Sequence, residues 1–288
     1  MADTAVPWVD LPREVTANIL QRLSVEDIFQ SAQVCTVWWR LLQDPSMWRY
    51  VDLWNLEAEP GKVRDWDKIC RVVVNRSEGQ LISIKLSHFA TDRLLFYIAQ
   101  RAKQLRHLGI RSRDVSDRGF SKAVKGFPLL EELQLKYTAI SIRGIEAAGR
   151  SCPFLNSFSF IKNLSGDESS DDGEAVAIAE NMHGLKHLTL DGNEMLEKGL
   201  EAILDACPLL QSLNLHHCDY LRLEGELWKR CSLQIKDLNY TDDYPAYLQN
   251  PYLYISDDFD EMVCEPIDWI DMVCEPSLHI MRPLNIRD

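Results

Sequence analysis

The apolar pattern Leu-x-x-Leu-x-Leu recurs along the middle of this chain, with Ile, Phe or Tyr at some of its positions. Its seven copies begin at Leu81, Leu105, Leu130, Leu155, Leu185, Leu210 and Ile235, in steps of 24, 25, 25, 30, 25 and 25 residues. A fixed period of this kind indicates a solenoid, in which one small structural unit repeats along an axis. A single unit cannot bury its own apolar side chains, so neighbouring units must stack around a common core.

Each unit combines a strand pattern with a helix pattern. The alternating Leu residues of a short strand point to one face of a sheet, and the segment after them has helical spacing, as at Leu200, Ile203 and Leu204. Glycines follow three of the anchor leucines by fourteen residues, and prolines precede three of them by two. These residues are Gly119, Gly144 and Gly199, and Pro128, Pro153 and Pro208. The one long step contains an acidic run at residues 167–174, which predicts an inserted surface loop.

Residues 11–48 carry a different pattern, of three short helices with almost no loop between them. Pro12 fits a first helical position, where its missing N–H costs nothing. Ser24 and Asp27 have the spacing of a capping box that starts a second helix, and Pro45 ends the third. So few residues cannot bury this much Leu, Ile and Trp among themselves. We therefore expect an uncovered apolar face, which usually marks a partner.

This segment resembles the F-box, whose spacing it fills without insertions. The matching residues are Leu11, Pro12, Glu14, Ile19, Leu20, Leu23, Asp27, Ile28, Val34, Cys35, Trp38 or Trp39, Arg40, Leu41, Asp44 and Trp48. The repeats resemble the cysteine-containing leucine-rich repeats of F-box proteins, with Cys152 and Cys207 before two of the prolines. The resemblance implies a plant-type F-box/leucine-rich-repeat protein, a substrate receptor of an SCF-type cullin–RING ubiquitin ligase. The F-box would bind the Skp-type adaptor, and through it the cullin and RING subunits, while the repeats hold the protein to be ubiquitinated.

The expected fold is therefore α/β, with an N-terminal trihelical F-box followed by a right-handed leucine-rich-repeat solenoid that forms a horseshoe arc. We expect a disordered N-terminus at 1–6, the F-box at 7–54, about seven repeats at 55–245, and a cap with an acidic tail at 246–288. The tail repeats the sequence MVCEP, at 262–266 and again ten residues later. A short duplication is its simplest origin.

The resemblance also implies which residues build or support the adaptor-binding face. They are Leu11, Pro12, Ile19, Leu20, Leu23, Ile28, Val34, Trp38 and Trp48. Thr16 stands where the family often has an aliphatic residue, so one apolar contact is weaker. The pair Trp38–Trp39 leaves open which indole enters the core.

The residues between the buried strand positions face the concave surface of a solenoid. In the N-terminal half of that surface they are basic, at Lys85, Arg111 and Lys136, with Lys162 beside them. We hypothesise that this surface binds an acidic or phosphorylated protein segment. A solvated charged face without a ligand is the alternative. His216, farther along, is also expected on the concave surface as a substrate-binding residue.

Charge and composition narrow the function further. The net charge is −13, of which −9 lies in residues 242–288, so non-specific nucleic-acid binding is not expected. Eight scattered cysteines lack zinc-like pairing and indicate reduced thiols of the nucleus or cytoplasm. Neither a secretory signal nor a membrane-spanning run is visible, and no membrane partner is expected.

No pattern indicates catalysis or a cofactor. His216, His217 and Cys218 are adjacent on a strand and so point to opposite faces, which makes them poor joint metal ligands. The cysteines are better explained as small buried hydrophobic residues than as nucleophiles. Phosphorylation of Ser169 or Ser170 in the acidic run is a further hypothesis. The alternative function is a leucine-rich-repeat scaffold that binds a partner without any role in ubiquitination.

Overall fold

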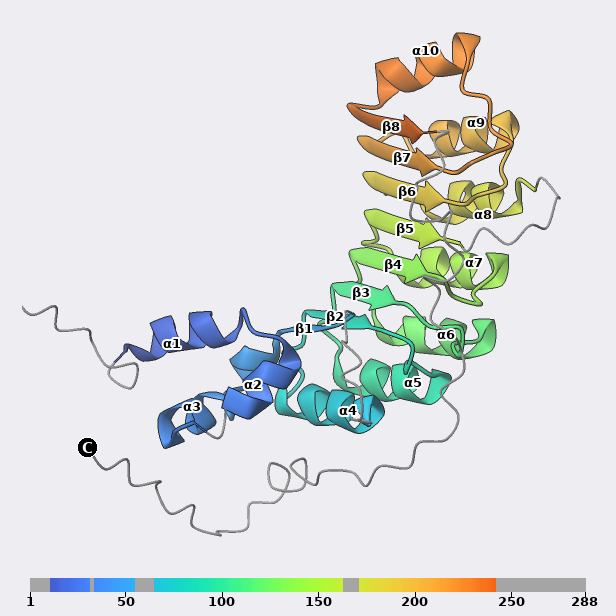
Figure 1. The fold of residues 1–288 in the computed structure, drawn as a ribbon. Coiled ribbons are helices and arrows are strands. Elements are labelled where there is room, and N and C mark those ends of the chain that lie inside the picture. The colour runs from blue at the N-terminus through green and yellow to red at the C-terminus, as the bar shows by residue number, and fades with distance from the viewer. Residues whose placement is uncertain (1–10, 32–33, 55–64, 163–170, 242–288) are drawn as a thin grey trace, which may run out of the picture.

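The computed structural model describes residues 11–31, 34–54, 65–162 and 171–241. A small helical unit leads into a row of stacked strands, with helices along one face of the sheet that the strands form (Figure 1). The predictions for 1–6, for Ser169 and Ser170, and for the cap and tail at 246–288 lie outside the described residues.

Three short helices and a 3-10 turn form the helical unit. They are α1 (Arg13–Leu20), α2 (Val25–Ser31), α3 (Thr36–Leu41) and the turn Pro45–Trp48. The predicted cap at Ser24 is confirmed, because the backbone N–H of Asp27 donates to Oγ of Ser24 at 3.1 Å. The Asp27 carboxylate accepts a hydrogen bond from the Ser24 hydroxyl at 2.8 Å. Pro12 immediately precedes α1 instead of being its first residue. Thr16 is buried, and its hydroxyl donates to the carbonyl oxygen of Pro12 at 3.2 Å, which satisfies the polar group that replaces an aliphatic one.

The repeats form one parallel sheet of eight strands in chain order. The strands are β1 (Tyr50–Leu53), β2 (Ser83–Leu86), β3 (His107–Ile110), β4 (Glu132–Lys136), β5 (Ser157–Ile161), β6 (His187–Asp191), β7 (Ser212–His216) and β8 (Asp237–Thr241). The helices are α4 (Trp66–Arg76), α5 (Asp92–Arg101), α6 (Asp117–Ala123), α7 (Ile142–Ser151), α8 (Gly173–Asn181), α9 (Glu197–Ala206) and α10 (Gly225–Gln234), with a 3-10 turn at Val124–Gly126. No helix in the described ranges has both the length and the hydrophobicity that a bilayer span requires.

The apolar strand positions form the core. Leu108, Leu133 and Phe158 are register partners on consecutive strands, and each is almost completely buried. A strand forms at each of the seven motifs, and the expected α/β solenoid is confirmed. The sheet has one more strand than the seven motifs predicted, because β1 forms inside the segment 7–54 that was assigned to the F-box. Val51 and Leu53 are the buried alternate residues of β1, which pairs with β2.

A hydrogen bond that joins neighbouring repeats explains the glycine register. The carboxylate of Asp92, at the start of α5, accepts hydrogen bonds from the backbone N–H and the hydroxyl of Ser116, which caps α6, at 2.8 and 2.6 Å. Asp117 and Ser141 repeat the arrangement one unit later. A side chain at Gly119 would lie 1.9 Å from Cγ of Asp92, so this position has room only for hydrogen.

Replacement of Gly119 by alanine is therefore expected to displace Asp92 and break the link between the two repeats. Loss of the two hydrogen bonds from Ser116 to Asp92 should lower the free energy of unfolding by about 1–3 kcal/mol, measured by urea unfolding. Gly184→Ala is the matched control, because the added methyl would meet nothing closer than 3.5 Å. Equal stabilities of the two variants would contradict the account of the register.

Candidate functional site: two protein-binding surfaces

The helical unit exposes an unusual amount of apolar surface. Five of the thirteen large apolar side chains that are exposed in the described part of the chain belong to it. They are Val15, Leu23, Val34, Val37 and Trp39. Val34 is 67% exposed and Trp39 is 45% exposed, although both types of side chain are normally buried. A concentration of this kind on one small element fits a surface that a partner covers.

The nine residues predicted to build or support the adaptor-binding face divide into two groups. Leu23, Val34 and Pro12 are exposed, and Leu11, Ile19 and Trp38 are half-buried. Leu20, Ile28 and Trp48 are buried in the core. These three residues therefore hold the helices in place and cannot themselves contact an adaptor in this conformation.

The structure also settles which indole enters the core. Trp38 packs against the core, whereas Trp39 is turned to the surface on α3. The sequence analysis missed Val15 and Val37 as surface residues and left Trp39 open. Helical spacing was the only available signal, and these helices are too short for spacing alone to separate a core face from a surface face.

A second candidate surface lies on the concave face at β2–β4. Lys85 on β2 pairs in register with Gly109 on β3, and Lys136 ends β4. The sequence analysis missed the central residue of this surface, which is Trp54. A side chain at Gly109 would lie 2.5 Å from Cζ3 of Trp54, so the indole occupies the space above that glycine. We name Trp54, Lys85, Arg111, Lys136 and Tyr137 the basic concave cluster.

Cations surround the aromatic rings of this cluster. Nζ of Lys136 lies 5.0 Å from the centroid of the Trp54 ring, and Cζ of Arg111 lies 5.6 Å from the centroid of the Tyr137 ring. Lys85 also forms an ion pair with Asp52 at 3.2 Å. Trp54 carries no motif of its own. Gly109 was the available signal, because the equivalent positions of the other repeats carry Lys, Gln, Ser, Thr or Asn.

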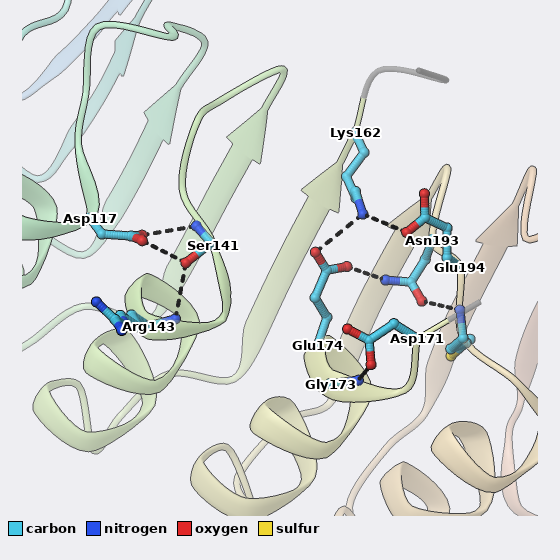
Figure 2. A network of polar contacts seen from close by, with 10 residues as sticks. Asp117, Ser141, Arg143, Lys162, Asp171, Gly173, Glu174, Asn193 and Glu194 are labelled. Atoms are coloured by element: carbon cyan, nitrogen blue, oxygen red, sulfur yellow. Dashed lines mark hydrogen bonds and ion pairs between the residues drawn. The ribbon is translucent and has the colours of Figure 1, made fainter. Parts of the chain in front are cut away.

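Lys162 was predicted beside this cluster, but it belongs to a separate network (Figure 2). Its ammonium group lies 3.3 Å from a carboxylate oxygen of Glu174 and 3.3 Å from one of Glu194. Glu174 also accepts a hydrogen bond from the amide of Asn193 at 2.7 Å. Burial disfavours the charge of Lys162, but the two carboxylates together raise its pKa. Lys162 therefore neutralises local acids instead of offering a free positive charge.

His216 also lies away from the basic concave cluster. It ends β7, where its register partner on β6 is Asp191. His217 is buried and contacts Oδ1 of Asp191 through Nδ1 at 2.7 Å. Within the ranges that the structure describes, no group of three or more His, Cys, Asp or Glu residues is arranged to hold a metal ion.

The repeat cysteines are structural. Burial raises the pKa of Cys152 to about 12 and that of Cys207 to about 11. Sγ of Cys207 lies 3.4 Å from the carbonyl oxygen of Met182 in the preceding repeat. A thiol with so high a pKa is protonated at neutral pH, which is the opposite of what a nucleophile requires.

Comparison with known proteins agrees with these features. The F-box-like family model matches residues 8–54. Putative F-box/LRR-repeat protein 23 of Arabidopsis thaliana is 42% identical over 240 residues, which cover 82% of this chain and 54% of that protein. F-box protein SKIP19 of the same plant is 40% identical over 238 residues, which cover 82% of this chain and 78% of that protein. Putative F-box/LRR-repeat protein 9, also from Arabidopsis thaliana, is 40% identical over 228 residues, which cover 77% of this chain and 92% of that protein.

The chain thus belongs to the F-box/leucine-rich-repeat family. It spans about half the length of protein 23 and more than three quarters of the other two relatives. F-box proteins serve in general as substrate adaptors of SCF-type complexes and are not themselves catalytic.

The network around Lys162 predicts a loss of stability when its cation is removed. Lys162→Met leaves two partly buried carboxylates beside each other without a positive charge, which should lower the free energy of unfolding by about 1–2 kcal/mol. Thermal unfolding at neutral pH measures the change. Lys186→Met is the control, because Lys186 is exposed and makes no ion pair with the described residues. Unfolding midpoints that agree within error would show that the network contributes nothing.

Proposed function

We propose that this chain is the substrate-recognition subunit of an SCF-type cullin–RING ubiquitin ligase. In this proposal the helical unit binds the Skp-type adaptor, and the repeats bind the protein to be ubiquitinated. The assembly would act in the nucleus or cytoplasm. The observation that carries the proposal is the exposed apolar surface of the F-box segment, at Val34 and Trp39 above all.

The mechanism requires no bond chemistry from this chain. The adaptor would connect the helical unit to the cullin and RING subunits, and the RING subunit would bring a ubiquitin-charged conjugating enzyme. Holding the substrate on the repeats makes the transfer to a substrate lysine effectively intramolecular, which is a large kinetic gain. The chain must supply two binding surfaces and a rigid body between them. Both candidate surfaces described above are parts of one folded chain.

The proposal predicts that a charged pair of substitutions on the helical unit weakens adaptor binding. Full burial of one large apolar side chain is worth about 1.5–3 kcal/mol, and about 1.4 kcal/mol corresponds to a tenfold change in affinity. Val34→Asp with Trp39→Arg should therefore weaken binding of a purified Skp-type adaptor by about tenfold or more. Calorimetry or a quantitative pull-down measures the change.

The matched control carries the same substitutions on the repeat helices. Trp228 on α10 is 46% exposed, which is close to the exposure of Trp39. Val176 on α8 is 38% exposed. Val176→Asp with Trp228→Arg introduces the same charges and should leave adaptor binding within about twofold, because no adaptor contact is lost. If both pairs reduce binding equally, the helical unit is not the adaptor site.

Ubiquitination needs its own measurement, because adaptor binding alone also fits a scaffold. Cells with inhibited proteasomes that express the intact chain should accumulate ubiquitinated forms of the proteins it captures. The Val34→Asp, Trp39→Arg variant should capture the same proteins without ubiquitination. Capture of adaptor with no adaptor-dependent ubiquitination of any bound protein would favour the scaffold.

A further inference from the structure

The indole of Trp54 lies across the concave face of the sheet because a turn directs it there. The backbone N–H of Trp54 donates to Oδ1 of Asp52 at 2.9 Å, which bends the chain directly after β1. The ring then reaches Gly109 on β3, although β1 and β3 are separated by β2. A half-buried aromatic ring on the otherwise polar face of a sheet forms a flat apolar floor. Such a floor is a common feature of protein-binding sites.

Two of the three cations around this floor have no ion-pair partner in the described parts of the chain. Arg111 and Lys136 form no ion pair with a described carboxylate, whereas Lys85 has its partner in Asp52. Burial lowers the pKa of Lys136, and the positive charges of Lys85 and Arg111 lower it further. The negative charge of Asp191 acts in the opposite direction and raises it. The three cations therefore repel one another, and an anion bound among them would remove that repulsion.

The cluster continues into a hollow beside the helical unit. The hollow has a volume of about 460 Å³, and Leu23, Tyr50, Asp52 and Lys85 are among the residues that line it. Lys85 belongs to both the hollow and the basic concave cluster. An extended ligand could thus place an anionic group among the cations and an apolar side chain toward Leu23 and Tyr50. The combination of anion site, aromatic floor and partly apolar hollow fits a peptide.

We propose that the basic concave cluster binds a phosphorylated, extended segment of the protein that the repeats present for ubiquitination. The phosphate is held by Arg111 and Lys136, and the side chain next to it lies on the ring of Trp54. This proposal rests on the substrate-receptor function and names the class of substrate. A phosphate carries about −1.5 to −2 charges, so it offsets the repulsion among three cations better than a single carboxylate does.

Nucleic acid fits the surface less well, because its phosphates need a basic stripe along many residues. Here the cations are confined to β2–β4. Farther along the same face, the positions equivalent to Lys136 are occupied by Asp191 on β6 and His216 on β7. The neighbouring positions on these two strands are Thr189 and Asn214, which are neutral. A single localised anion site therefore suits one phosphorylated residue in a protein segment.

The test uses the full chain in complex with an Skp-type adaptor. Its probe is a fluorescently labelled degenerate peptide library centred on phosphoserine or phosphothreonine, together with the same library without phosphate and one centred on glutamate. We expect the phosphorylated library to be enriched at least about tenfold over the unphosphorylated one, in line with charge-assisted pairing. Arg111→Glu with Lys136→Glu should remove this enrichment, and binding should fall by about tenfold or more.

The matched control reverses two exposed cations on the helices that cover the other face. Lys122 on α6 and Arg143 on α7 are both exposed, so Lys122→Glu with Arg143→Glu gives the same net charge without touching the cluster. It should bind the phosphorylated library within about twofold of the unchanged chain. Equal losses in the two double variants would mean non-specific attraction and would overturn the proposal.

A neutral variant tests the aromatic floor and guards against misfolding of the charge-reversed chain. Gly109→Ala would place a methyl group against Cζ3 of Trp54 and 3.1 Å from Cγ of Lys85, which forces the indole to shift. Peptide binding should fall by about threefold or more at an unchanged thermal midpoint. The proposal fails if neither anionic library binds, if glutamate serves as well as phosphate, or if single-stranded RNA displaces the peptide at equal charge.

Adaptor binding is measured on every variant, because it separates this proposal from the receptor function. Loss of peptide binding with intact adaptor binding supports the site as described. Adaptor binding with no phosphopeptide enrichment overturns the site and leaves the receptor function standing. Phosphopeptide enrichment by a chain that binds no adaptor overturns the receptor function, and the cluster then stands as a phosphopeptide site of another kind of protein.

Discussion

Burial of alternate strand residues in a core shared between neighbouring repeats is the interaction on which the rest of this structure depends. Leu133 is completely buried because Leu108 and Phe158 lie beside it on the adjacent strands. The same alternation sends the residues between them to the concave face. A shift of the register by one residue would exchange the two faces. The apolar core therefore also determines which side chains can reach a substrate.

The repeat pattern was sufficient to predict the strands from β2 to β8, because each has three apolar positions at fixed spacing. It did not predict β1, because Trp48, Val51 and Leu53 have the same spacing but lie in the segment 7–54 that was assigned to the F-box. The glycine register was visible in the sequence, but its cause was not. Only the structure shows that the carboxylate of Asp92 occupies the space beside Gly119.

The candidate sites were less predictable, because they depend on contacts between residues far apart in the chain. Lys162 has the same charge as Lys136 and a neighbouring position, yet it is paired with Glu174, the last residue of the acidic run, and with Glu194 beyond it. Trp54 follows a strand without any motif, and its role is set by Gly109 more than fifty residues later. The F-box pattern likewise combines core residues and surface residues, and only packing separates Trp38 from Trp39.

The connection between the two surfaces is itself a physical requirement of the proposed function. Proximity accelerates a transfer only when the reacting groups are held in a fixed arrangement. Here the helical unit is tied to the repeats through Trp48, whose indole N–H donates to the carbonyl of Leu42 at 2.9 Å and whose ring stacks on Phe29. The guanidinium of Arg76, on α4, lies 5.6 Å from the Phe29 ring and 5.7 Å from the Trp48 ring.

Strand β1 continues this connection, because it begins two residues after Trp48 and ends directly before Trp54. The chain that leaves the F-box core thus becomes the first strand of the sheet and then supplies the floor of the basic concave cluster. A hinge between adaptor and substrate would have to break either the buried contacts of Trp48 or the pairing of β1 with β2. Both are parts of the hydrophobic core, so a substrate bound at Trp54 would keep a fixed distance from an adaptor bound at Trp39.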